Sequence, residues 1–138
     1  PLLKELKTNS TSQIDCIKRV DVFNDETKIA FQLFNVLSPS EVQNIISAAE
    51  SAGFKELTGY QKSYRSNWRV IIDDEEMCSI LYERIKGFLP TTLQVKRPGG
   101  VWEKIGLNNR LRFCRYTQGQ AFGTHRDGFF QRSSNERS

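Results

Sequence analysis

The sequence predicts an α+β domain in which helices pack on an antiparallel sheet. Three observations lead to this prediction. Strand-like segments and amphipathic helices alternate along the chain, turn chemistry joins the first two strand-like segments, and a strand–turn–strand pattern comes last. At 138 residues the chain has the length of one domain, and no internal repeat or low-complexity tract divides it.

The composition is that of a globular protein. Hydrophobic residues make up 38% of the chain, aromatic residues 11% and charged residues 26%, which argues against a disordered chain. No apolar run approaches the roughly 20 residues that span a membrane, and no secretory signal opens the sequence, so we expect no membrane partner. The formal net charge of +4 comes from basic residues scattered among acidic ones, which argues against nucleic acid as the main partner.

The three cysteines, Cys16, Cys78 and Cys114, are odd in number and far apart, and none of them forms a C-x-x-C motif. This spacing favours neither a disulfide framework nor a zinc site. We therefore expect three reduced, mostly buried thiols in a reducing compartment, which favours a cytoplasmic location.

The N-terminal part of the chain begins with a polar segment. Residues 1–12 end in a cluster of Ser, Thr and Asn and are predicted to be a tail or linker, so that the domain covers residues 13–138. Two β-patterned segments follow, at about Asp15–Phe23 and Lys28–Leu37, and the residues Asn24-Asp25-Glu26 between them favour a hairpin turn.

A helix is predicted from about residue 39 to residue 52. Ser38 has the N-cap position, Pro39 the first helical position and Glu41 the third, which together form a capping box with a helix-starting proline. Gly53 can supply the left-handed stop. The apolar residues of this segment recur at helical spacing and predict a packing face: Val42, Ile45, Ile46 and Ala49.

The middle of the chain alternates between short strands and loops. Residues 54–57 have the pattern of a short strand, residues 58–67 that of a polar, tyrosine-rich loop, and residues 68–72 that of another strand. Residues 94–100 contain Lys-Arg-Pro-Gly-Gly and are predicted to be a loop, after which residues 101–102 begin a short extended piece.

A second helix should begin at Asp73 or Asp74, because acidic side chains in the first turn complement the helix dipole. Pro90 follows its end. Its apolar residues are predicted to form a buried stripe: Met77, Ile80, Leu81, Ile85 and Phe88.

The candidate chemistry lies near the end of the sequence. A strand ending at Tyr116 leads through a glycine-marked turn to a second predicted strand, which carries His125, the only histidine, and Asp127. Side chains at positions i and i+2 of a strand share one face, so an imidazole nitrogen and a carboxylate oxygen can approach one point. Such a pair supplies two of the three ligands of a 2-His-1-carboxylate Fe(II) site. The alternative interpretation is a surface-loop histidine beside a turn aspartate, with Gly128 completing the turn.

This part of the sequence resembles a known family, the prolyl 4-hydroxylase-like branch of the Fe(II)/2-oxoglutarate-dependent dioxygenases. In that family a strand ending in tyrosine leads through a Pro-Gly-type turn to an H-x-D motif. The resemblance covers about Ile29 to Gly128, with Gln118 standing where proline is usual. The matching segments are Arg65-Ser-Asn67, Arg112-Phe-Cys-Arg-Tyr116, Gly119-Gln120 and His125-Arg-Asp127-Gly128.

The resemblance implies N-terminal helices packed on the first part of a double-stranded β-helix, or jelly roll. It also implies Fe(II), 2-oxoglutarate, O2 and ascorbate, with hydroxylation of a peptidyl proline or a related substrate and release of succinate and CO2. By the same resemblance His125 and Asp127 would be iron ligands, and the Tyr116 hydroxyl would contact 2-oxoglutarate. The residues that match positions near the substrate site are Arg65, Asn67 and Arg112.

The sequence departs from the family in one important respect. The family uses a second histidine on a later strand and, beyond it, a Lys or Arg that pairs with 2-oxoglutarate. This sequence has one histidine, and the residues after Gly128 are too few to complete the roughly eight strands of a jelly roll. We therefore expect the N-terminal part of a catalytic domain, which binds iron weakly and is inactive on its own, with an open sheet edge that invites association.

Two other functions are compatible with the sequence. One is a non-catalytic interaction domain in which Arg110, Arg112 and Arg115 contact an acidic partner or RNA. The other is a nucleic-acid demethylase of the same superfamily. The sequence does not specify the substrate, which is a peptide, a protein or a small molecule in the dioxygenase interpretation, and it does not specify the oligomeric state.

Overall fold

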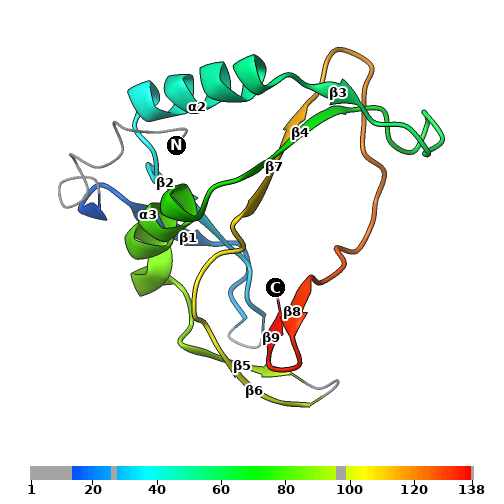
Figure 1. The fold of residues 1–138 in the computed structure, drawn as a ribbon. Helices are drawn as coiled ribbons and strands as arrows, with labels where there is room; N and C mark the ends of the chain where they lie inside the picture. The colour runs from blue at the N-terminus through cyan, green and yellow to red at the C-terminus, as the bar shows by residue number, and fades with distance from the viewer. Residues whose placement is uncertain (1–13, 26–27, 96–98, 138) are drawn as a thin grey trace.

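The computed structural model describes residues 14–25, 28–95 and 99–137, so the tail predicted for residues 1–12 lies outside the described residues. The described part is an α+β structure in which every strand pair is antiparallel and no strands close into a barrel. The α+β prediction is therefore confirmed. The elements in chain order are β1 (Lys18–Asp21), β2 (Phe31–Phe34), α2 (Pro39–Ala52), β3 (Lys55–Glu56), β4 (Trp68–Asp73), α3 (Glu75–Ile85), a 3-10 turn (Lys86–Phe88), β5 (Thr92–Val95), β6 (Gly100–Glu103), β7 (Arg110–Arg115), β8 (Gln131–Ser133) and β9 (Glu136–Arg137) (Figure 1).

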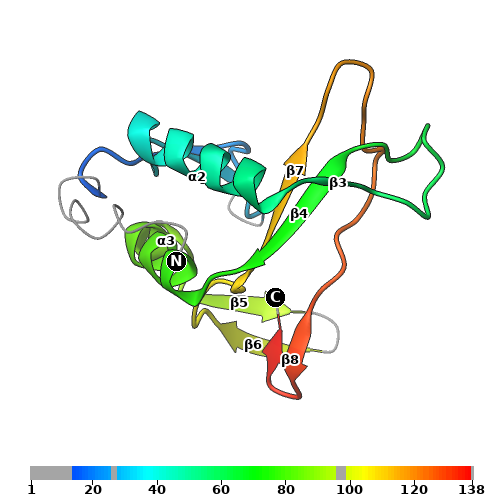
Figure 2. The ribbon, with the colours of Figure 1, turned by 45° about the horizontal axis from the view of Figure 1, so that its top comes forward.

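The central sheet has the strand order β3-β4-β7. Strands β4 and β7 pair over six positions, from Trp68 opposite Arg115 to Asp73 opposite Arg110. Because side chains alternate between the two faces, Phe113 lies on the face that packs against Met77 of α3. Figures 1 and 2 show α2 and α3 on one side of β4 and β7, and the segment between β7 and β8 on the other side.

Helix α2 forms because its ends are capped as the sequence predicts. The Ser38 Oγ accepts a hydrogen bond from the Glu41 backbone N–H at 3.3 Å, and the Glu41 carboxylate accepts one from the Ser38 N–H at 2.8 Å. Gly53 ends the helix with a positive φ of 84°. The predicted helix over residues 39–52 is confirmed, but its apolar stripe is only partly covered: Val42 is 40% exposed and Ile46 48%.

Helix α3 begins after Asp74, whose carboxylate accepts a hydrogen bond from the Met77 N–H at 2.9 Å, as the acidic first turn predicts. The predicted stripe extends too far, because Phe88 lies in the 3-10 turn that follows the helix. Met77 is the centre of the hydrophobic core. The residues that pack against it are Leu37, Ile45, Ile80, Leu81, Leu111 and Phe113.

Four predictions about strands need correction. The first hairpin is shorter than expected, because its strands pair only over β1 and β2. Residues 94–100 are not simply a loop, because β5 and β6 extend into both ends of that segment. The polar composition of residues 131–138 predicts a surface loop, but residues 131–137 contain the β8–β9 hairpin. Finally, residues 120–128 do not form a strand, because no described strand pairs with them. They make only one isolated bridge to the other described residues, between Phe122 and Arg65.

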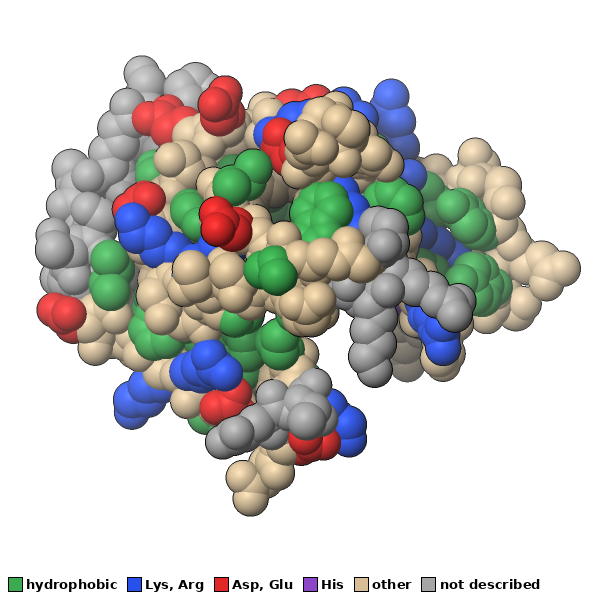
Figure 3. All heavy atoms as spheres, turned by 90° about the horizontal axis from the view of Figure 1, so that it is seen from below, with side chains coloured by type: hydrophobic (Ala, Val, Ile, Leu, Met, Phe, Trp, Pro, Cys, Tyr) green, Lys and Arg blue, Asp and Glu red, His purple; other side chains and the backbone are tan. Residues whose placement is uncertain are grey.

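The fold leaves much apolar surface uncovered. Many large apolar side chains of the described residues are exposed, among them Ile105 at 69%, Phe129 at 64% and Val101 at 63%. Figure 3 shows hydrophobic side chains reaching the surface on the face seen from below. Within the described residues, none of the helices combines the length and the apolar character needed to cross a membrane.

Candidate functional site

The candidate ligands lie in the extended segment after β7. The turn that leads into it is closed by a hydrogen bond from the Gln120 N–H to the Thr117 carbonyl at 3.0 Å, and Gly119 adopts a φ of 81° in this turn. The Gln120 side chain also accepts a hydrogen bond from the Thr117 N–H at 2.9 Å. The predicted glycine turn is thus present, and it redirects the chain away from the central sheet (Figure 2).

The segment is attached to the loop before β4 by three hydrogen bonds. The Gly123 N–H donates to the Tyr64 carbonyl at 2.7 Å and the Ser66 N–H to the Ala121 carbonyl at 3.2 Å, while the Ala121 N–H donates to the Ser66 hydroxyl at 3.3 Å. A Cβ atom at Gly123 would lie 2.8 Å from a ring carbon of Tyr64, closer than real Cβ contacts come. Glycine is therefore needed here because the two segments approach so closely.

His125 and Asp127 face each other. The His125 Nε2 lies 3.1 Å from the Asp127 Oδ1, and the His125 Nδ1 lies 2.8 Å from the Gly123 carbonyl oxygen. A carbonyl oxygen only accepts, so Nδ1 donates to it, and in the neutral form of the ring Nε2 then has a lone pair directed at the carboxylate. Two acceptors at this distance repel each other unless a proton or a metal cation lies at Nε2. The pair is therefore suited to hold a cation.

The site is open to solvent. The side chain of Asp127 is 93% exposed and that of His125 31% exposed. A side-chain contact with this exposure contributes little to stability by itself. Its position at the surface instead makes both groups accessible to a ligand.

Arg65 and Asn67, two of the predicted site residues, are linked to His125 through the Phe122 ring. The Arg65 Nε donates to the Asn67 Oδ1 at 2.9 Å, and the Arg65 guanidinium lies over the Phe122 ring at 3.9 Å. Phe122 in turn stacks on the His125 ring with 3.7 Å between ring centroids and 20° between planes. The structure thus brings Asn67, Arg65, His125 and Asp127 into one continuous set of contacts.

Asn67 has no exposed surface, and its amide also donates to the Trp68 carbonyl at 3.0 Å. Its observed contacts are therefore structural, and its role toward a substrate stays a prediction.

Tyr116 and Arg112 lie apart from this set. The alternation of β7 puts Arg112 on the sheet face opposite the helices. Tyr116 directly follows the end of β7 and is 44% exposed. Neither side chain makes a hydrogen bond, ion pair or ring contact with the described residues. Their predicted roles toward 2-oxoglutarate and substrate stay predictions.

His125 and Asp127 could supply part of the ligand set that Fe(II) requires. An imidazole nitrogen and a carboxylate oxygen are suitable ligands, and the Gly123 carbonyl bound to Nδ1 is the kind of second partner that orients a ligating histidine. The two groups therefore fit two positions of a three-ligand face. In the described residues no group of three or more His, Cys, Asp or Glu side chains is placed to hold a metal.

The arginines of the alternative interaction interpretation do not form one patch. Arg110 makes a bidentate ion pair with Asp73, with both nitrogen–oxygen distances at 3.0 Å. Arg115 points to the helix face, where it pairs with Glu50 at 3.4 Å and lies over the Phe54 ring. Of the three, only Arg112 has no ion-pair partner in the described residues.

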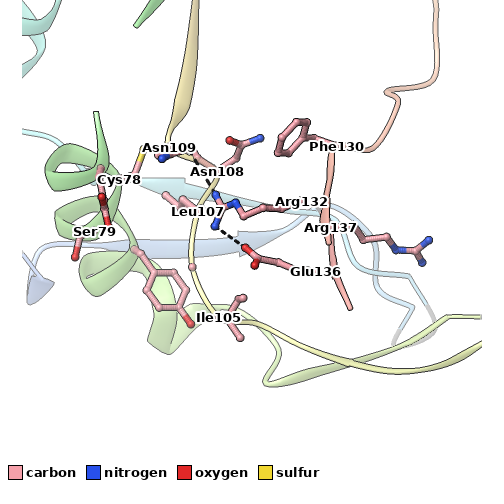
Figure 4. Close-up of a pocket in the computed structure, with 13 residues that line it drawn as sticks. Cys78, Ser79, Ile105, Leu107, Asn108, Asn109, Phe130, Arg132, Glu136 and Arg137 are labelled. Carbon is pink, nitrogen blue, oxygen red and sulfur yellow. Dashed lines mark hydrogen bonds and ion pairs between the residues drawn. The ribbon is translucent and has the colours of Figure 1, made fainter. Parts of the chain in front are cut away.

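A separate cavity of about 290 Å³ lies between α3, residues 105–109 and the β8–β9 hairpin. In Figure 4, the Arg132 side chain reaches across this hairpin to Glu136 at 2.5 Å and to Asn109 at 3.5 Å. None of the predicted site residues lines this cavity. The candidate ligands thus lie on an exposed surface outside this cavity.

Sequence reasoning missed two residues of the site, Phe122 and Tyr64. The rings of these two residues meet edge to face at 5.7 Å and 82°. The available signal was the aromatic residue three positions before His125, which was not interpreted. The prediction of mostly buried thiols is also wrong, because Cys16 and Cys114 are exposed and only Cys78 is buried.

The chain was compared with family models, with curated proteins and with solved structures. No family model matches it, and neither a curated protein nor a solved structure matches it.

Proposed function

We propose that this chain supplies two iron ligands of an Fe(II)- and 2-oxoglutarate-dependent dioxygenase of the prolyl 4-hydroxylase-like branch. Its reaction is the hydroxylation of a peptidyl proline or a related substrate, with release of succinate and CO2. The observation that carries the proposal is the geometry of His125: Nδ1 is bound to the Gly123 carbonyl at 2.8 Å and Nε2 faces the Asp127 carboxylate at 3.1 Å.

Each residue has a defined part in this proposal. The Gly123 carbonyl keeps the proton on Nδ1, so that Nε2 of His125 offers its lone pair to the metal. Asp127 adds the anionic oxygen ligand, and the Tyr116 hydroxyl binds a carboxylate of 2-oxoglutarate. Bound iron with 2-oxoglutarate and dioxygen supplies the oxidising power, whereas the protein supplies position and exclusion of water.

The remaining ligand has to come from elsewhere. The sequence contains one histidine, so the second imidazole of the family's iron site belongs to another polypeptide segment. The segment after β7 leaves the central sheet and runs along the side opposite the helices (Figures 1 and 2). The jelly roll of the proposal would need further strands to pair with this segment.

Metal binding by the 138-residue chain tests the ligand assignment. Mn(II) is added during NMR measurements of the histidine ring signals, which are unambiguous because the sequence has one histidine. We expect selective broadening at His125, and its loss in Asp127→Asn. Glu103→Gln, the same charge change at an exposed residue of β6, should leave the broadening unchanged. Mn(II) binding of unchanged affinity after replacement of both His125 and Asp127 by alanine would contradict the assignment.

Activity is measured on the complete protein encoded by the gene. Succinate release that depends on Fe(II) and 2-oxoglutarate, and that disappears in His125→Ala, is the expected result. Absence of succinate release, together with a steep salt dependence of RNA affinity, would favour the non-catalytic interpretation instead.

A further inference from the structure

We propose that Phe122 and Arg65 are positioning residues, which fix the imidazole of His125 through a three-layer stack of guanidinium, phenyl ring and imidazole. The proposal rests on the proposed function for its effect on metal binding, but the stack itself belongs to the metal-free chain. It gives Arg65 a role that differs from substrate contact.

The histidine needs such a support. It lies in a segment that pairs with the rest of the described chain through a single bridge, and its side chain is 31% exposed. The hydrogen bond from Nδ1 to the Gly123 carbonyl fixes one edge of the ring, but a single hydrogen bond tolerates some rotation of the ring plane about the Cβ–Cγ bond. A second constraint is needed to direct Nε2, because a metal ligand has to be aimed within about 10–20°.

Phe122 supplies this constraint. Its ring is nearly parallel to the imidazole, at 20°, and the centroids are 3.7 Å apart, which is full van der Waals contact over one face. Rotation of the imidazole about its Cβ–Cγ bond would break this contact. The imidazole is thus held on its face by the stacking contact and at its edge by the hydrogen bond.

Arg65 lies on the opposite face of the phenyl ring. Its guanidinium carbon is 3.9 Å from the Phe122 centroid, too close for an approach at the ring edge, where a carbon atom stays at least about 4.4 Å from the centroid. The face toward His125 is already occupied at 3.7 Å. The guanidinium and the imidazole therefore sandwich Phe122.

The stack is anchored to the central sheet. The Arg65 Nε donates to Asn67, which has no exposed surface and in turn donates to the carbonyl of Trp68, the first residue of β4. Tyr64 contacts the edge of the Phe122 ring at 82° and so opposes its rotation. Through these contacts the position of His125 is tied to the best-paired strand of the molecule.

The stack is tested on the metal-free chain by the chemical shifts of the His125 ring protons. A phenyl ring in parallel contact moves these signals upfield, and we expect Phe122→Leu to move them back toward the values of an exposed histidine. Phe122→Tyr, which keeps the ring, should retain the upfield shift. Phe54→Leu is the matched control, because Phe54 also lies under an arginine, Arg115 at 4.8 Å.

The consequence for the metal is measured separately. Phe122→Leu and Arg65→Met should weaken Mn(II) binding about tenfold, the lower end of the loss found when the residues that orient a ligand are removed. Arg115→Met should leave the affinity unchanged. Amide signals of β4 and β7 report whether each variant remains folded, and Phe122→Tyr is the conservative variant that should rescue both readouts.

The outcomes separate this proposal from the proposed function. Histidine ring signals that are the same in Phe122→Leu and in the unchanged chain would overturn the stack, whatever the metal does. Upfield-shifted signals in a chain that binds no Mn(II) would support the stack as a structural unit and count against the iron assignment alone. A normal Mn(II) affinity in Phe122→Leu would overturn the positioning role.

Discussion

Glu41 and Arg84 form a bidentate ion pair in the interior between α2 and α3, although they are 43 positions apart in the sequence. The two nitrogen–oxygen distances are 2.9 and 2.7 Å, and the residues are 7% and 1% exposed. Arg84 also donates to the Val36 carbonyl at 3.1 Å, while Glu41 accepts from the Ser38 N–H of the capping box. One carboxylate therefore both caps α2 and attaches it to α3.

Replacing Arg84 by methionine should destabilise the chain strongly, because the methionine leaves the Glu41 carboxylate buried without its partner. Breaking a buried pair in this way costs about 3–5 kcal/mol in free energy of unfolding. Denaturant unfolding measures the loss. The control is Arg110→Met, which breaks the exposed pair with Asp73 and should change little. A loss in Arg84→Met no greater than in this control would show that the buried pair is unimportant.

The same pair predicts how stability depends on pH. The hydrogen bond from Arg84 lowers the pKa of the Glu41 carboxyl below its ordinary value of 4.5, and this effect outweighs burial, which raises the pKa. A carboxyl whose pKa is lower in the folded chain contributes stability above the unfolded pKa and loses it as the pH falls through the folded pKa. The free energy of unfolding should therefore decrease as the pH is lowered below about 5.

Glu41→Gln should make this part of the pH profile flatter, because the group that titrates is removed. Urea unfolding at several pH values measures the slope. A slope identical in Glu41→Gln and the unchanged chain would assign the acid sensitivity to other carboxyls.

The sequence predicted those elements whose signals are local. Helix α2 has its N-cap, its first-turn proline and its C-terminal Gly53 within one short segment, so its bounds were correct. The Asp74 cap of α3 and the strand β4 were also correct for local reasons. The approach of His125 and Asp127 was predicted from a strand that would place both side chains on one face. Residues 120–128 form no strand, and the two side chains meet in an extended segment instead.

Features that depend on distant residues were not predictable in this way. A segment becomes a strand only where another strand pairs with it. Among the described residues, residues 120–128 make one isolated bridge, together with a few hydrogen bonds and ring contacts. The burial of a cysteine depends on which other parts of the chain pack over it. The alternation of side chains along a strand does not specify those parts. The stack of Arg65, Phe122 and His125 and the pair of Glu41 with Arg84 join residues far apart, and no local pattern marks such partners.

The three thiols should differ in reactivity. Burial raises the pKa of the Cys78 thiol, with a further contribution from the negative charge of Asp74, and the thiol donates to the Asn108 carbonyl at 3.2 Å. The reactive species is the thiolate, so Cys78 should react slowly with iodoacetamide, whereas the exposed Cys16 and Cys114 react quickly. Mass spectrometry of the alkylated protein counts the modified residues over time. Rapid alkylation of all three in the folded chain would contradict the burial of Cys78.

Replacing Gly123 by alanine should disturb the candidate site without a change in charge. The new Cβ would lie 2.8 Å from a ring carbon of Tyr64, so the ring or the backbone has to move. Forced contacts of this kind cost about 1–3 kcal/mol. Because Gly123 donates to the Tyr64 carbonyl and its own carbonyl binds His125, the displacement should appear in the NMR signals of the histidine ring.

Gly128→Ala is the control for this substitution, because a Cβ atom at that position meets nothing within 4 Å. Alanine there should leave the histidine signals unchanged, and it restricts the unfolded chain in the same way as alanine at position 123. Any loss of stability in Gly123→Ala relative to Gly128→Ala therefore measures the close approach of the two segments. Equal stability in both variants, with unchanged histidine signals, would mean that Tyr64 moves aside freely and that the attachment of the His125 segment does not depend on this glycine.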